Sequence, residues 1–208
     1  MTVQRHFLYT TYMNFSTLSL LGIAGGIFAT IGIVPNMRDI IWGKTRPERA
    51  TWLIWVVLGC IAFASQLAKG ATDSLWMTGL ETLGQLVVLV LAFKFGVGGL
   101  QKKDIIALSI AGLGLILWYF TKEAAVALYI IIAIDFIGSF LTIQKSYLDP
   151  GSETLTTWIL AWIGGLLTTF AVGKLDIVLV SYPIFIMLMN GMIAIAILLG
   201  RNGLKKKF

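Results

Sequence analysis

The chain has 208 residues, of which 58% are hydrophobic and 12% are charged, with a formal net charge of +6 and a mean hydropathy of +0.88. Soluble domains carry about twice that charged fraction, and a water-soluble fold of this size would expose far too much apolar surface. The composition therefore predicts an all-α protein integral to the cell membrane and leaves no room for a separate soluble catalytic domain.

Seven apolar stretches follow one another along the chain, each close to the roughly 20 residues that a helix needs to cross a bilayer. We expect helices over residues 18–36, 51–68, 74–95, 104–121, 124–143, 155–173 and 177–199. Only Thr121-Lys122-Glu123 separates the fourth helix from the fifth, and one long helix is the alternative. Ionisable residues in the middle of a span are costly, so a tight turn is favoured.

The basic residues indicate an orientation. In a seven-helix arrangement, one side receives twelve of the 16 lysines and arginines: Arg38, Lys44, Arg46, Arg49, Lys94, Lys102, Lys103, Lys145, Arg201, Lys205, Lys206 and Lys207. Cytoplasmic loops carry such an excess. We therefore expect a cytoplasmic C-terminus and an N-terminus outside, and we expect membrane lipid rather than nucleic acid as the partner of these clusters.

The N-terminal segment is predicted to be retained. Arg5 precedes a polar, aromatic stretch rather than a short apolar run with a cleavage site, so no removable signal peptide is expected. The one cysteine, Cys60, excludes an intramolecular disulfide framework and a cysteine-based zinc site. The one histidine, His6, lies outside the helices, and no nucleophile–base set is evident. We expect neither an enzyme nor a bound cofactor.

The two halves of the chain resemble each other. A shift of 106 residues aligns Ile31-Gly32 with Ile137-Gly138, Thr51-Trp52 with Thr157-Trp158, and Gly59 with Gly165. Chance similarity of helix ends is the alternative. The predicted organisation is an extracellular segment (1–17), a three-helix repeat (18–95), a linker with the fourth helix (96–123), a second repeat (124–200) and a basic cytoplasmic tail (201–208). One linker helix gives both repeats the same orientation, so they would be parallel repeats.

The end of the first predicted helix carries a family resemblance. This helix ends in Ile33-Val34-Pro35-Asn36, a short basic loop follows, and the next helix opens with Thr51-Trp52. The pattern resembles the first repeat of the PQ-loop and SWEET superfamily of seven-helix transporters, although Asn36 stands where that family has glutamine. The resemblance implies a carrier or facilitator of a small polar solute, with its site between the repeats near mid-membrane. Vitamin carriers of the nicotinamide riboside type share this architecture, so the solute is a sugar, a vitamin or nucleoside-like molecule, or an amino acid.

Polar residues inside the predicted spans are the candidates for substrate binding, because each is costly in hydrocarbon unless it is paired or hydrated. Glu81 and Gln85 share a face of the third helix, and Asp135 lies in the fifth. Asn190 lies in the seventh helix, where it is the repeat partner of Gln85 and would face it across the central axis. Capping of buried structural networks is the alternative role. A carboxyl group can carry a proton, so facilitated and proton-coupled transport through Asp135 or Glu81 both remain open.

Aromatic residues and prolines supply the remaining candidates. Trp55 and Trp162 are expected in the cavity because an indole stacks on flat rings, whereas Trp52 and Trp158 suit the membrane interface. Tyr182 would point inward beside Pro183, which would kink its helix. Pro35 is the other hinge candidate.

Other classes of membrane protein fit the sequence less well than a transporter. A receptor of related architecture or an ion channel is the alternative, with Glu81 and Asp135 as part of a cation path. A retinal protein is excluded because residues 177–199 contain no lysine. The oligomeric state is left open, a homo-oligomer included.

Overall fold

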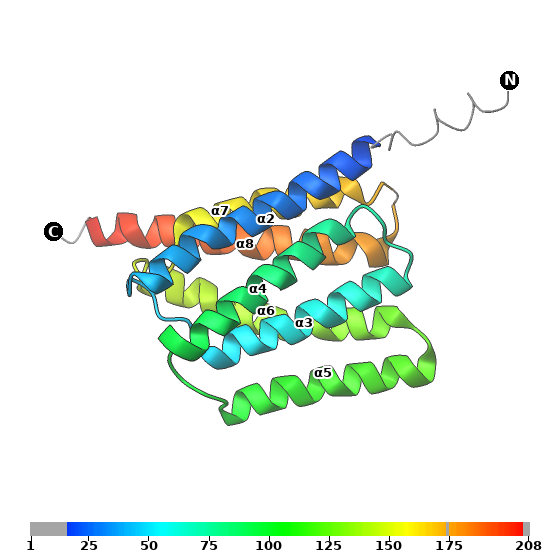
Figure 1. Ribbon diagram of the computed structural model, residues 1–208, viewed down its shortest axis with the longest axis horizontal. Coiled ribbons are helices and arrows are strands. Elements are labelled where there is room, and N and C mark those ends of the chain that lie inside the picture. Colours follow the sequence, from blue (N-terminus) through cyan, green and yellow to red (C-terminus); the bar gives the residue numbers. More distant parts are fainter. Residues whose placement is uncertain (1–15, 174, 206–208) are drawn as a thin grey trace, which may run out of the picture.

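The computed structural model describes residues 16–173 and 175–205, and within these ranges the chain folds as a bundle of seven α-helices (Figure 1). The helices are α2 (Thr17–Ile41), α3 (Arg49–Ala68), α4 (Leu75–Phe95), α5 (Lys102–Thr121), α6 (Ala124–Leu148), α7 (Leu155–Ala171) and α8 (Ile177–Lys205). Successive helices run in opposite directions, so the bundle begins at one end and finishes at the other. The predicted set of seven helices is confirmed for these residues.

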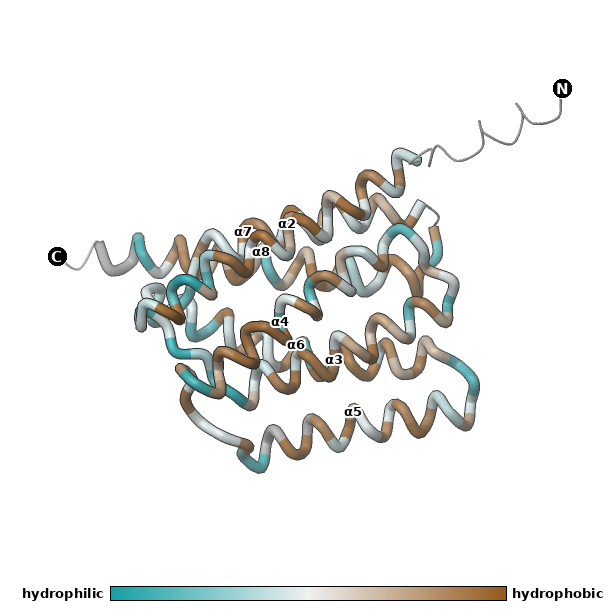
Figure 2. Tube along the Cα trace, in the orientation of Figure 1, coloured by the Kyte–Doolittle hydropathy of each residue, from teal (hydrophilic) through white to brown (hydrophobic). Residues whose placement is uncertain are grey.

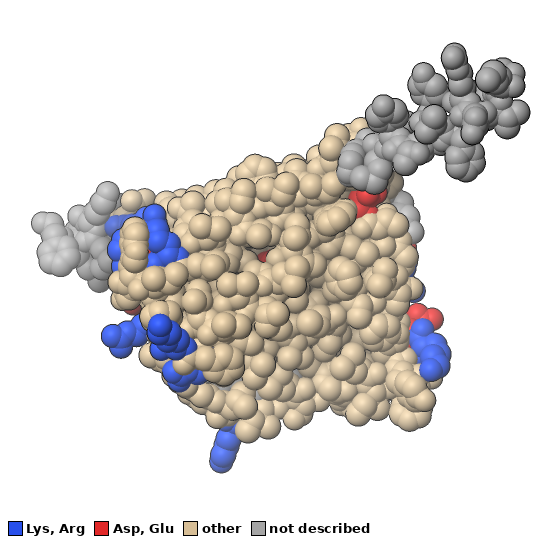
Figure 3. Space-filling model, viewed as in Figure 1, with Lys and Arg blue, Asp and Glu red and all other residues tan. Residues whose placement is uncertain are grey.

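An apolar band separates two polar rims. Hydrophilic residues lie mainly near the ends of the helices (Figure 2), and charged side chains border an uncharged belt (Figure 3). Within the described residues, five helices are long and apolar enough to cross a membrane, namely α2, α3, α4, α6 and α8, while α5 and α7 contribute the shorter apolar stretches Leu108–Thr121 and Leu155–Ala171. Large apolar side chains such as Val90, Phe93 and Ile137 are exposed on the outer surface, as expected of a protein that contacts lipid.

Three helices extend further than the apolar pattern predicts. Helix α2 continues past Pro35 to Ile41, so the prediction that it ends at Pro35-Asn36 is wrong, and Pro35 lies inside a helix. Helix α6 continues to Leu148 and α8 to Lys205, so part of the predicted tail is helical. The predicted bounds followed the apolar stretch that crosses the hydrocarbon. The helices continue past that stretch because lysine, arginine and glutamine are also good helix formers. Of the predicted extracellular segment, residues 1–15 lie outside the described ranges.

A tight turn separates α5 from α6, as predicted. Lys122 has a positive φ of 58°, the left-handed conformation that commonly ends a helix. Its backbone N–H donates to the carbonyl of Trp118 at 2.8 Å, and α6 begins two residues later at Ala124. The alternative of one long helix is therefore excluded.

The order of helix contacts recurs in the two halves of the bundle. Helix α4 packs against both α2 and α3, and α8 packs in the same way against both α6 and α7. The two triplets meet through α2 with α7 and through α3 with α6, and α5 lies at the edge against α6 and α3. When α2, α3 and α4 are matched to α6, α7 and α8, the two inter-triplet contacts are equivalent.

Small residues make the contact between α2 and α7 the more extensive of the two. A Cβ atom on Gly164 would lie 2.7 Å from the carbonyl oxygen of Gly25, and one on Gly32 would lie 3.1 Å from the carbonyl oxygen of Thr157. Ala29 and Ala161 are also buried. Residues without large side chains let two helix backbones approach closely in a membrane, so this interface is closed by direct backbone packing.

Candidate functional site

The contact between α3 and α6 contains a polar pair instead. The indole Nε1 of Trp55 donates to Oδ1 of Asp135 at 3.2 Å, and the hydroxyl of Ser139, one turn along α6, also hydrogen-bonds Asp135. Asp135 lies near the middle of α6, so the pair joins the two triplets far from either polar rim. A carboxylate at this depth is costly unless it is hydrogen-bonded or hydrated.

Two further polar groups lie within electrostatic range of Asp135. The carboxyl groups of Glu81 on α4 and Asp135 lie within range of each other's charge, and both lie within range of the hydroxyl of Tyr182 on α8. Tyr182 is 7% exposed, and Glu81 and Asp135 are half-buried. We call Trp55, Glu81, Asp135, Ser139 and Tyr182 the central polar cluster. It brings together four residues that the sequence singled out, from four different helices.

A small hollow in the middle of the face drawn in Figure 3 exposes acidic side-chain atoms within the uncharged belt. Within the described residues, Glu81 and Asp135 are the acidic residues that lie away from the helix ends. The carboxylate of Glu81 makes no hydrogen bond or ion pair with a described residue. A carboxyl group without a protein partner in this belt requires a proton, water or a ligand.

The basic residues do not neutralise this cluster. The ion pairs among described residues are Arg38–Asp39, Lys69–Glu123 and Lys145–Glu153, at distances of 3.1, 3.6 and 3.0 Å. All three lie at the ends of helices, and Figure 3 shows the lysine and arginine side chains at the rims. Two acidic groups therefore share the middle of the bundle without a described cation beside them.

No hydrogen bond joins Gln85 to Asn190. The side-chain amide of Asn190 donates to the carbonyl of Ile186 in its own helix at 2.8 Å. Oε1 of Gln85 is buried and has no hydrogen-bond partner among the described residues. Repeat equivalence placed both residues at similar depth, but a side-chain amide four residues from a helix carbonyl satisfies itself locally. Gln85 therefore keeps an acceptor free, one turn from Glu81.

The aromatic and proline candidates divide into two groups. Trp55 stands edge-on to Trp52, with ring centroids 5.1 Å apart, and belongs to the cluster. Trp162 is 40% exposed on α7 and lies against Gly191 of α8, where no hydrogen bond joins it to the cluster. Pro183 lies inside α8 beside Tyr182, as predicted.

A buried amide in α3 was missed by the sequence analysis. Gln66 is fully buried, and its Nε2 donates to Oγ1 of Thr78 at 3.1 Å and to the carbonyl of Ala62 at 3.3 Å. The sequence could have indicated this pair, because Gln66 is a polar residue inside a predicted span and therefore needs a hydrogen-bond partner. Thr78 on the adjacent helix is that partner. The pair connects α3 to α4 within one triplet, so we interpret it as structural.

The Gln66–Thr78 pair gives a test of this structural role. Thr78→Val leaves the amide of Gln66 with one partner fewer and is expected to destabilise the protein by about 1–3 kcal/mol. Adding Gln66→Leu should recover most of that loss, because no polar group is then left unpaired. Unfolding midpoints in detergent measure both effects. A double variant less stable than Thr78→Val would contradict the interpretation.

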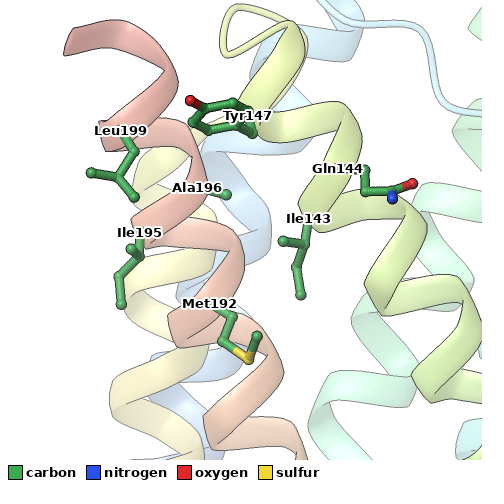
Figure 4. A pocket seen from close by; sticks show the side chains of 7 residues that line it. All are labelled: Ile143, Gln144, Tyr147, Met192, Ile195, Ala196 and Leu199. Atoms are coloured by element: carbon green, nitrogen blue, oxygen red, sulfur yellow. The ribbon is translucent and has the colours of Figure 1, made fainter. Parts of the chain in front are cut away.

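Two grooves lie away from the central polar cluster. The larger, of about 370 Å³, runs between α6 and α8 and is lined by Ile143, Gln144, Tyr147, Met192, Ile195, Ala196 and Leu199 (Figure 4). The smaller, of about 260 Å³, lies near the starts of α2, α4 and α8. Apolar side chains dominate the first groove, so it does not match a site for a polar solute.

Comparison of the chain with protein-family models, with curated proteins and with solved structures gives no match.

Proposed function

We propose that this protein is a membrane transporter or facilitator of a small polar solute, with its site at the central polar cluster. The observation that carries the proposal is the hydrogen bond from Trp55 to Asp135 between the two helix triplets, with Glu81 and Tyr182 within electrostatic range of the carboxylate. Ionisable residues in the interior of a membrane bundle typically mark a solute or ion pathway. The resemblance to the PQ-loop and SWEET superfamily and the recurring order of helix contacts support a pair of parallel three-helix repeats.

The difference between the two inter-triplet contacts favours a particular motion. A shift of 106 residues matches Asp135 to Ala29 and Trp55 to Ala161, so the polar pair of one interface corresponds to two buried alanines in the other. Backbone packing between α2 and α7 would act as the pivot, while α3 and α6 separate to admit solute. Pro35 and Pro183 would supply local flexibility within α2 and α8.

Orientation and energy coupling are part of the proposal. The end of the bundle that carries Arg38, Arg49, Lys94 and Lys145, which we call the basic rim, would face the cytoplasm, with the N-terminus outside. Repulsion between the carboxylates of Glu81 and Asp135 would be relieved by a proton, which makes proton-coupled transport a form of the mechanism beside facilitated transport. An inward proton gradient would then accelerate uptake by the wild type and not by Asp135→Asn.

The test is a screen followed by a transport assay on the full-length protein. Sugars, nucleosides, vitamins and amino acids are screened for thermal stabilisation in detergent, and each stabilising solute is then tested for uptake into proteoliposomes. We expect one class to stabilise the protein and to enter by saturable uptake. Absence of saturable uptake of every stabilising solute would contradict a transporter.

A cation channel is the second candidate, because the two acidic groups lack a described ion-pair partner. Recordings in planar bilayers distinguish the two functions. Discrete single-channel cation currents that Glu81→Gln reduces would favour the channel, whereas a transporter gives saturable flux without unitary currents.

A further inference from the structure

We propose that the central polar cluster selects an organic cation, a small solute carrying an ammonium, guanidinium or similar group. This inference rests on the proposed function and narrows its solute class. Three features of the cluster support it: its charge, its aromatic walls and its free acceptors.

The charge of the cluster calls for a cationic ligand. Glu81 and Asp135 approach from different triplets, and each described ion pair lies at a helix end. Coulombic attraction is several times stronger at low dielectric than in water. A cation between the two carboxylates would interact with both, whereas an anion would be repelled by both and a neutral solute would leave their repulsion in place.

The aromatic side chains distinguish an organic cation from a metal ion. Trp55 and Trp52 form an edge-on pair, and the ring of Tyr182 is buried close to both carboxylates. Indole and phenol faces attract ammonium and guanidinium groups and pack against their carbon atoms, but they are not metal ligands. Among the described residues, no group of three acidic, histidine or cysteine side chains could hold a metal ion.

Free hydrogen-bond acceptors complete the match. The carboxylate of Glu81 has no hydrogen-bond donor among the described residues, and Oε1 of Gln85, one turn further along α4, is buried without a partner. Ammonium and guanidinium groups are donors without acceptors. Acceptors that the fold leaves unpaired are therefore satisfied by this class of solute.

The experiment compares cations with neutral molecules of the same shape. Full-length protein in detergent is titrated with butylammonium and butanol, and with methylguanidinium and methylurea, and binding is measured by thermal shift and isothermal calorimetry. We expect the cationic member of at least one pair to bind at least about tenfold more tightly than its neutral partner. Glu81→Gln and Asp135→Asn should each remove that preference while keeping side-chain shape.

Controls separate this inference from the proposed function. Glu153→Gln removes a carboxylate at the start of α7, outside the cluster, and should leave the preference for cations intact. Equal binding of neutral partners, failure of both cations to bind, or stabilisation by Na⁺ or Ca²⁺ alone would overturn the inference. Saturable uptake of a neutral solute would then still support a transporter, whereas binding of cations without any uptake would contradict the transporter alone.

Discussion

Asp135→Asn is expected to reduce solute uptake into proteoliposomes by at least about tenfold, and Trp55→Phe by a smaller factor. The hydrogen bond from Nε1 of Trp55 to Oδ1 of Asp135 involves a charged acceptor, and such bonds contribute about 1.5–3 kcal/mol. Asparagine also removes one of the two negative charges of the cluster. The measurement is the initial rate of uptake of a solute that stabilises the wild type.

A double-variant cycle shows whether the two side chains act as a unit. If they do, Trp55→Phe adds little further loss once Asp135 has been replaced by alanine, which leaves no acceptor for the indole N–H. The matched control is the bond from Nε1 of Trp158 to Oε2 of Glu153, at 3.3 Å and near the basic rim. Trp158→Phe should leave uptake near the wild-type rate. Equal reductions of the uptake rate by Trp55→Phe and Trp158→Phe would contradict a specific role of the Trp55–Asp135 pair in transport.

Gly164→Ala is expected to destabilise the protein at the contact between α2 and α7. The new Cβ would lie 2.7 Å from the carbonyl oxygen of Gly25 and 3.1 Å from the backbone nitrogen of Ala29. Backbone atoms cannot rotate away as a flexible side chain can, so α2 and α7 must separate. Overpacking of this kind costs about 1–3 kcal/mol, measured as a lower unfolding midpoint in detergent.

Gly138→Ala is the matched control for that substitution. Gly138 also lies inside a helix, α6, but a Cβ atom there would meet nothing within 4 Å. Alanine is the better helix former by about 1 kcal/mol, so this variant should be as stable as the wild type or slightly more stable. Similar midpoints for the two variants would show that α2 and α7 are not locked by backbone contact, and the proposed pivot would fail with them.

Part of the central polar cluster was predictable because of where its residues stand in the sequence. Glu81 and Asp135 interrupt long apolar runs, and the energetic cost of such interruptions indicates a function or a specific partner. Tyr182 was predictable from its neighbour Pro183, because a proline inside a helix can kink it and turn the adjacent side chain inward. Ser139 was not, because a serine in a membrane helix usually bonds its own backbone, and only the packing shows it beside Asp135.

The similarity of the two halves does not determine how each side chain is partnered. Gln85 and Asn190 occupy similar positions in the two halves, yet Asn190 bonds within its own helix. Trp162 resembles Trp55 in sequence context, yet α7 presents it at the surface. Sequence similarity between halves gives depth in the membrane, but rotation of each helix about its axis is set by packing against its neighbours.

Hydropathy alone determined that this chain is an all-helical membrane-type protein with seven helices, because burial of backbone polar groups in hydrocarbon leaves few other solutions. The positions of the basic residues at the helix ends and the turn at Lys122 were also determined by short stretches of sequence. Only the tertiary structure decided that small residues close α2 against α7 while Trp55 and Asp135 meet between α3 and α6. Such pairings depend on which faces of distant helices come into contact, and a one-dimensional pattern of apolar residues is nearly the same on every face of a lipid-embedded helix.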